Sequence, residues 1–321
     1  MSPALLKSAT LVLMMSAGFL AWRLRVLTRE AVQALSRFLV DFTLPALIIV
    51  SMQRPFSPEL RDAAFLTLGI SSAVYAVSIP AALLLARALG APRNSRGTYA
   101  FAASFSNVAF MGFPVMEALF GRESLFAVSV NNIPFQVLAF SAGIVMIASG
   151  HEPAGNGAGT DSRGPRSSPR LSFRSLVNPA IVATLLGFGF FLFSVRVGEP
   201  LYGALEALGS VTTPLSMVLI GAMLARAKLG RTLGEWRVWV LSAWRLFLHP
   251  AALWLILRAL GAEGMILAVP VVVAAMPVAA NTSILAEVYG GDSETASGLV
   301  FLTTVLSTLS IPLLARVLFG A

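Results

Sequence analysis

Ten apolar stretches of membrane length constrain this chain more than any other feature of its sequence. A helix needs roughly 20 apolar residues to cross a bilayer, and each stretch approaches that length. They lie at residues 3–22, 33–52, 63–88, 98–119, 124–149, 176–195, 201–225, 237–260, 264–288 and 296–318. Only 12% of the 321 residues are charged, against roughly 25% in soluble domains. The sequence therefore predicts an all-α membrane protein with ten transmembrane helices.

Composition argues against several classes of function. The net charge of +8 comes from basic residues between the apolar stretches, where membrane orientation explains them better than nucleic acid does. The chain has no cysteine, which excludes disulfides, thiol catalysis and thiolate metal sites. We find neither a histidine spacing suited to a metal nor a phosphate-binding GxxxxGK[ST] loop. We therefore expect no enzyme activity, no bound cofactor and no nucleic-acid partner.

A change in composition divides the chain into two parts. Residues 150–175 are rich in glycine, serine, proline and arginine, which is typical of a flexible linker. The parts before it (1–149) and after it (176–321) each hold five apolar stretches. Short matches recur at a spacing of 169 to 171 residues, among them Pro80-Ala81-Ala82-Leu83 with Pro250-Ala251-Ala252-Leu253. They indicate an internal duplication, and an odd number of spans per copy inverts the second copy.

Basic residues indicate the orientation. The loops after spans one, three, five and seven hold 15 lysines and arginines, whereas the opposite side holds 7. Positive residues favour the cytoplasmic side. We therefore expect both termini outside, the 150–175 linker in the cytoplasm, and insertion in the cell (inner) membrane.

Two apolar stretches are interrupted by polar residues, within 104–121 and 276–291. Broken backbone at membrane depth is tolerated only where protein or an aqueous cavity surrounds it. Paired interruptions in the two halves of a transporter point to its binding site. Asn107 and Pro114 would share one helix face, as would Pro277 and Asn281, and helix N-termini freed there would favour a carboxylate or phosphate. The alternative is that the prolines only kink packed helices and the asparagines join neighbours.

Several ordered segments together resemble the auxin efflux carrier family, which includes plant auxin exporters and bacterial malate or malonate permeases. The resemblance covers nearly the whole chain outside the linker. The segments are NVAFMGFPVMEALFG (107–121), NPAIVATLLG (178–187), PLSMVLIGAMLA (214–225), MPVAANTSILAEVYGGD (276–292) and TTVLSTLSIPLL (303–314).

This resemblance implies a ten-span fold similar to that of bile acid sodium symporters. Spans one, two, six and seven would form a scaffold, and spans three to five and eight to ten a moving transport domain. Spans four and nine would break and cross at their prolines, so that Asn107, Pro114, Pro277 and Asn281 flank the substrate carboxylate. Some relatives imply a homodimer.

Other polar residues in the spans have two interpretations each. Asn131, Asn132 and Gln136 could line the same cavity or bind a coupling cation through their carbonyls, or could join neighbouring helices. Asp41, Glu117 and Glu287 could couple transport to H⁺ or Na⁺, or could be solvated near span ends. Arg245 could balance an anionic substrate, but we expect it to extend to the cytoplasmic face. His249 could move a proton, or could satisfy the kink beside Pro250.

These observations favour a secondary transporter that moves a small organic anion, such as a carboxylate, by an elevator-like or rocking movement. One alternative is a sodium-coupled symporter of the bile acid type, which would need a cage of oxygen ligands between spans four, five and nine. Another is a membrane sensor or anchor, although we find no appended soluble domain to receive a signal.

Overall fold

A computed structural model describes residues 3–149, 178–226 and 232–319. Within these ranges every regular element is helical, apart from one isolated β-bridge. The all-α prediction is therefore confirmed. The predicted linker at 150–175 lies outside the described residues.

The elements of the described ranges follow in chain order, with three π-helical turns (η1, η2 and η4) and one 3₁₀ turn (η3) among them. The first half holds α1 (Pro3–Arg23), α2 (Arg29–Phe38), η1 (Leu39–Thr43), α3 (Leu44–Met52), α4 (Pro58–Ala88), α5 (Arg93–Ser104), η2 (Val108–Gly112), α6 (Phe113–Phe120), α7 (Ser124–Ala139) and α8 (Ala142–Ala148). The second half holds α10 (Pro179–Leu192), α11 (Leu201–Ser210), α12 (Thr212–Arg226), η3 (Thr232–Gly234), α13 (Trp236–Ala243), η4 (Trp244–Leu248), α14 (His249–Ala259), α15 (Gly264–Ala275), α16 (Thr282–Tyr289) and α17 (Ser293–Phe319).

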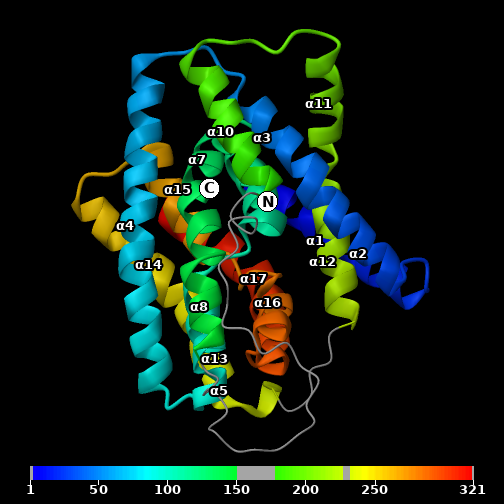
Figure 1. Cartoon of the computed structure of the whole chain (residues 1–321), viewed down its shortest axis with the longest axis vertical. Helices are drawn as coiled ribbons and strands as arrows, with labels where there is room; N and C mark the ends of the chain where they lie inside the picture. Colours follow the sequence, from blue (N-terminus) through cyan, green and yellow to red (C-terminus); the bar gives the residue numbers. More distant parts are fainter. Residues whose placement is uncertain (1–2, 150–177, 227–231, 320–321) are drawn as a thin grey trace, which may run out of the picture.

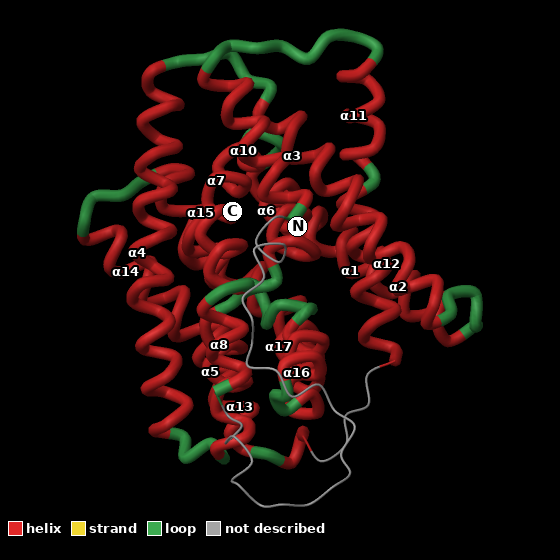
Figure 2. Tube along the Cα trace, in the orientation of Figure 1, coloured by secondary structure: helices red, strands yellow, loops and turns green. Residues whose placement is uncertain are grey.

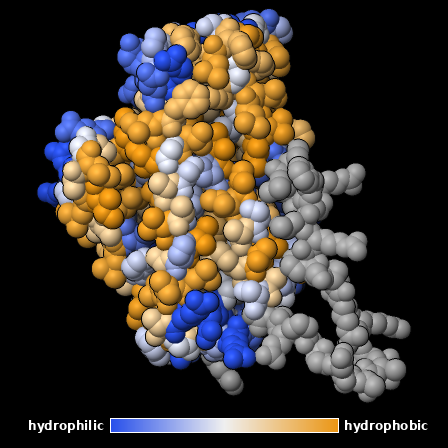
Figure 3. Space-filling model, turned by 60° about the vertical axis from the view of Figure 1, so that its left-hand side comes forward, coloured by the Kyte–Doolittle hydropathy of each residue, from blue (hydrophilic) through white to orange (hydrophobic). Residues whose placement is uncertain are grey.

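Membrane-length helices confirm the prediction of ten spans only in part. In the described ranges, six helical segments are long and apolar enough to cross a bilayer: Arg29–Met52, Pro58–Ala88, Ser124–Ala148, Leu201–Arg226, Trp236–Ala259 and Ser293–Phe319. Three apolar helices are shorter: Val108–Phe120, Pro179–Leu192 and Gly264–Ala275. The surface agrees with membrane insertion, since hydrophobic residues cover most of the middle of the face in Figure 3 and hydrophilic residues gather toward its ends.

Glycines allow two helices from opposite halves to pack closely. α1 runs along α12, and a Cβ added to Gly18 would lie 1.9 Å from the carbonyl oxygen of Val218. A Cβ on Gly221 would lie 1.8 Å from the carbonyl oxygen of Met15. Small residues permit this backbone approach in membranes, where packing rather than water expulsion holds helices together. α10 packs along α3, where Gly187 lies against the Met52 side chain.

α2, α11 and α12 lie at the right of Figure 1. The helices α4, α14 and α15 lie at its left.

Each π-helical turn precedes a proline. η1 comes before Pro45, η2 before Pro114 and η4 before Pro250, each at the second position of the α-helix that follows. A proline ring clashes with the carbonyl four residues earlier and leaves it without a partner. A wider turn accommodates that clash, and it also changes which residues face inward. This matters most at η4, because Arg245 lies within it.

Candidate functional site at two crossing helix breaks

The predicted interruptions are breaks that meet each other inside the molecule (Figure 2). α5 ends at Ser104, and the chain runs on in non-helical conformation through residues 105–107 before η2. α15 ends at Ala275, and the chain stays non-helical through residue 281 before α16. The two segments pair as an antiparallel bridge between Ser106 and Val278.

Two backbone hydrogen bonds hold this pairing. The Asn107 N–H donates to the Pro277 carbonyl at 2.8 Å, and the Ala279 N–H donates to the Phe105 carbonyl at 3.2 Å. Buried backbone groups released by both breaks thus satisfy each other, as a low-dielectric interior requires.

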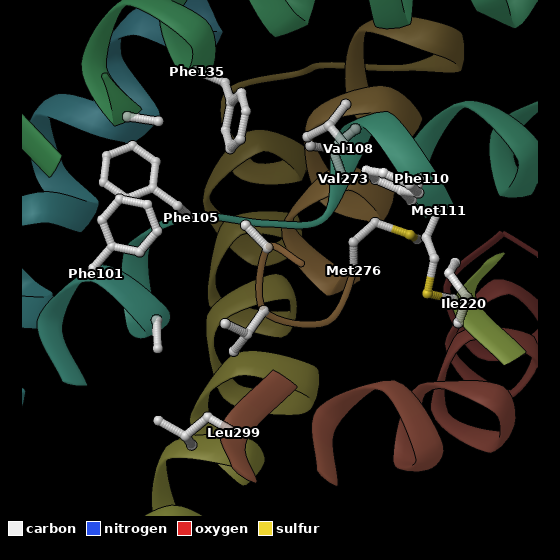
Figure 4. Close-up of a cluster of buried hydrophobic side chains, with 14 of the residues drawn as sticks. Phe101, Phe105, Val108, Phe110, Met111, Phe135, Ile220, Val273, Met276 and Leu299 are labelled. Carbon is white, nitrogen blue, oxygen red and sulfur yellow. The ribbon is translucent and has the colours of Figure 1, made fainter. Parts of the chain in front are cut away.

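Apolar side chains pack on both sides of this crossing (Figure 4). Phe105 contacts Phe101 and Phe135, at ring centroid distances of 4.6 Å and 5.9 Å. Met276, on the other segment, is fully buried and lies toward Met111. The backbone of the crossing is therefore buried, with apolar side chains on both sides of it.

The four residues predicted to flank a substrate differ in their positions. Asn107 and Pro277 lie at the crossing, with the Asn107 side chain 4% exposed and accepting a 3.4 Å hydrogen bond from the Phe110 N–H. Asn281 is half-buried and immediately precedes α16, and its side chain makes no capping hydrogen bond there. The expectation that span four breaks at Pro114 is wrong. Pro114 is the second residue of α6, where a proline fits, and the break comes at residues 105–107.

Arg245 is bonded inside the crossing, so the expectation that it extends to the cytoplasmic face is wrong. Its side chain is fully buried. Nε donates to the Met276 carbonyl at 3.1 Å, and one terminal nitrogen donates to the carbonyls of Ala103 and Ser104 at 3.0 Å and 3.2 Å. The other terminal nitrogen donates to the Ser106 hydroxyl. None of the ion pairs found among the described residues involves Arg245.

The electrostatics of the crossing follow from helix polarity. Ala103 and Ser104 end α5, and Met276 follows the last residue of α15, so Arg245 binds the partially negative ends of two helices. η2 and α16 begin on the far side of each break, with partially positive ends that Asn107 and Asn281 precede. A guanidinium thus faces the carbonyl ends of α5 and α15, whereas the N-terminal ends of η2 and α16 point the opposite partial charge toward the crossing.

Beside the crossing lies a small cavity of about 10 Å³, lined by Ser71, Val74, Tyr75, Ser104, Ser106, Asn131, His249, Pro270, Val273 and Ala274. Asn131 is 2% exposed. Its side-chain oxygen and that of Asn132 are buried without a hydrogen-bond partner among the described residues. The His249 Nε2 lies 2.9 Å from the Ser78 hydroxyl. Gln136 joins neighbouring helices, because its Oε1 accepts a 2.9 Å hydrogen bond from Asn178 at the start of α10.

The three acidic candidates lie away from the crossing. Asp41 is exposed on the outer surface of η1, and Glu287 is exposed on α16. Glu117 sits between elements, where its Oε2 accepts a 2.7 Å hydrogen bond from Thr213 of α12 and its Oε1 lies 3.4 Å from Arg122. A cavity of about 280 Å³ lies beside this group, between α3 and α11 on one side and α6 and α7 on the other.

Asp292, which sequence reasoning passed over, joins α17 to α5. Its carboxylate accepts hydrogen bonds from the Thr295 N–H (2.9 Å), the Thr295 hydroxyl (2.6 Å) and the Ser95 hydroxyl (2.8 Å). Partial burial raises the pKa of this carboxyl, but these hydrogen bonds to its charged form together outweigh burial and lower the pKa below its ordinary value. The sequence signal is an aspartate directly before a helix, with threonine three residues later.

The sequence is similar to a known protein family and to individual known proteins. The family described as "Membrane transport protein" matches residues 3–315. An "Uncharacterized transporter" from Methanothermobacter thermautotrophicus (strain Delta H) is 27% identical over 302 residues, which is 94% of each chain. A "Putative malonate transporter" from Rhizobium meliloti (strain 1021) is 26% identical over 297 residues, covering 92% of this chain and 89% of that one.

Proposed function

The chain belongs to the membrane transport protein family, and on that premise we propose that it is a secondary transporter of small organic anions, specifically carboxylates. The observation that carries the proposal is the hydrogen-bonded crossing of the two helix breaks. Partially positive helix ends at η2 and α16 attract a carboxylate, and the Asn107 and Asn281 amides supply donors without burying a further charge. The malonate named for one relative has this chemistry.

The packing supports alternating access between two bundles. α1, α3, α10 and α12, held together by close glycine contacts, serve as the scaffold with α2 and α11. The crossing belongs to the other bundle, formed by α4 to α8 and α13 to α17. Contacts such as Thr213 with Glu117 join the bundles, and the cavity of about 280 Å³ lies between them. An elevator-like displacement of the second bundle moves the site across the bilayer.

An inverted repeat is part of this proposal. α1, the first span of the chain, packs on α12, while α10, the first span of the second half, packs on α3. Such a reciprocal exchange is what two copies related by inversion would make. With the basic loops in the cytoplasm, both termini lie outside, and the cavity beside Glu117 opens toward the outer side. A homodimer through the scaffold is compatible with this arrangement.

Uptake into proteoliposomes tests the function. Labelled malonate is compared with mono- and dicarboxylates of other lengths and with a neutral diamide of malonate. We expect saturable uptake of at least one carboxylate and none of the diamide. Asn107→Ala and Asn281→Ala should each lower uptake by tenfold or more, whereas Asn94→Ala, at an exposed position outside the crossing, should leave it unchanged. Undiminished uptake by both crossing variants would show that the site lies elsewhere.

A further inference from the structure

Arg245 fills a cage of oxygen atoms at the crossing. Its guanidinium donates to three backbone carbonyls, those of Ala103, Ser104 and Met276, and to the hydroxyl of Ser106. The three carbonyls come from the ends of α5 and α15 and the hydroxyl from the break itself, and the crossing brings them together. The side chain is fully buried, and in the described part of the chain no carboxylate pairs with it.

Such a cage is chemically a cation site. Carbonyl and hydroxyl oxygens are the ligands of hard cations, and helix C-termini add partial negative charge. In transporters with broken helices, carbonyls freed by unwinding and half-helix C-termini hold the coupling cation. A buried positive charge is tolerated only if such groups compensate it. Here these oxygens surround a guanidinium that no carboxylate of the described residues pairs with.

The π-helical turn η4 accounts for the presence of Arg245 in the cage. The turn ends just before His249 and Pro250, and the wider ring directs Arg245 inward while the neighbouring Phe247 and Leu248 remain exposed. Arginine suits this role better than lysine, because its planar fork can engage several fixed acceptors at once and it stays protonated when buried.

We propose that Arg245 is a tethered cation that occupies the place of an inorganic coupling ion at the crossing, so that Na⁺ neither binds there nor drives transport through that site. The inference rests on the proposed transport function, because only a transporter has a coupling ion. The occupancy of the cage can nevertheless be measured without transport. It bears on the sodium-coupled alternative, because the carbonyls that spans four and nine bring to the crossing are already bonded to the guanidinium.

Thermal unfolding of the purified full-length chain, followed by the fluorescence of its 5 tryptophans, tests occupancy. Na⁺ replaces choline at constant ionic strength, so that general screening stays fixed. The wild-type protein should show no saturable Na⁺-specific shift. Arg245→Ala should have a lower unfolding temperature, and Na⁺ or methylguanidinium at millimolar concentration should raise it again by roughly 3 °C or more as the ion fills the vacated cage.

The matched control is Arg237→Ala. Arg237 also donates to a backbone carbonyl, that of Leu89 at 2.8 Å, and is partly buried, but it lies outside the crossing. Neither ion should stabilise this variant. If Arg245→Ala fails to fold, Arg245→Lys keeps a charge in the cage and should remain insensitive to Na⁺.

A saturable Na⁺ stabilisation of the wild-type protein would overturn the proposal, and so would a folded Arg245→Ala that responds to neither ion. Failure of the transport function would appear instead as absent carboxylate uptake, with these unfolding results unchanged.

Discussion

The N–H of Asn107 donates a 2.8 Å hydrogen bond to the carbonyl of Pro277, joining two helix breaks that lie 170 residues apart in the chain. The two nearby asparagine side chains nevertheless differ in their local roles. Asn107 caps η2 through the Phe110 N–H, whereas Asn281 makes no capping bond at α16. Substitution by alanine should therefore separate structure from binding.

Asn107→Ala should lower the free energy of unfolding by roughly 0.5–2 kcal/mol, the usual loss for a helix cap. Asn281→Ala should leave stability unchanged while lowering uptake of the transported carboxylate. Thermal unfolding and uptake measured on the same preparations check both results. Equal destabilisation by the two variants would mean that Asn281 is structural.

The contact between Thr213 and Glu117 should bias the two bundles toward the arrangement described above. A hydrogen bond of this kind contributes roughly 1 kcal/mol, or about a fivefold change in population. Because the chain has no cysteine, Ser51→Cys places a single thiol in the cavity of about 280 Å³. Without the contact, the described arrangement should be less populated. Adding Thr213→Val should therefore slow the labelling of that thiol by an impermeant maleimide several-fold.

The control for this labelling is Thr10→Val, since Thr10 is exposed and bonds only within its own helix. An unchanged labelling rate in the Thr213 variant would mean that the contact does not hold the bundles.

Proline should have opposite effects at two positions that the sequence repeat relates. Pro80 lies inside α4, an unbroken α-helix, whereas Pro250 follows η4. Pro80→Ala restores a helical donor and should be neutral or stabilising. Pro250→Ala removes the steric clash that the wide turn accommodates. We therefore expect Arg245 to lose its hydrogen bonds to the cage oxygens and the unfolding temperature to fall by several degrees. A higher unfolding temperature for Pro250→Ala would show that the cage contacts of Arg245 do not depend on the wide turn.

Close packing of the scaffold should make Gly18 and Gly221 intolerant of side chains. Alanine at Gly221 would place its Cβ 1.8 Å from the Met15 carbonyl oxygen, so the backbones of α1 and α12 must separate. Overpacking of this kind costs roughly 1–3 kcal/mol. Gly69→Ala, which meets nothing within 4 Å, should be neutral or slightly stabilising. Chemical or thermal unfolding of both variants checks the difference.

Asp292 should make stability depend on acid. Its pKa is lowered in the folded protein, so its contribution is present above the ordinary value of 3.8 and is lost as the pH falls through the lowered pKa. Asp292→Asn should reduce stability at neutral pH and flatten the acid limb of a stability–pH profile. If the wild-type protein and Asp292→Asn lose stability equally as the pH falls, other carboxylates are responsible for that loss.

Hydropathy alone predicted the helical class and most of the long helices, because burial in lipid selects for uninterrupted apolar runs. The polar residues within 104–121 and 276–291 also indicated where helices stop. The site of the first break could not be read correctly, since Pro114 fits the start of α6 as well as it would mark a break. A proline at the start of a helix and a proline at a helix break look alike in the sequence, and only the contacts with neighbouring segments distinguish them.

The role of Arg245 escaped sequence reasoning for a related reason. Its acceptors exist only after α5 and α15 end side by side, and no local pattern encodes their convergence. The inward orientation of the Arg245 side chain also depends on η4, and hydrophobic periodicity does not reveal a widened turn. Asp41, by contrast, looked costly within a span but is exposed on η1. The predicted roles of Asn131, Gln136 and His249 stay predictions.

The bridge between Ser106 and Val278 also sets an order for biogenesis. When the ribosome has finished the first half, the Phe105 carbonyl and the Asn107 N–H have no final partners, and they wait until residues 277 and 279 have been synthesised and inserted. The nascent protein must therefore shelter an open polar break within the membrane while the 170 residues from Asn107 to Pro277 are translated. Two fragments divided between residues 149 and 178 should accumulate only when produced together, each serving as the folding template of the other.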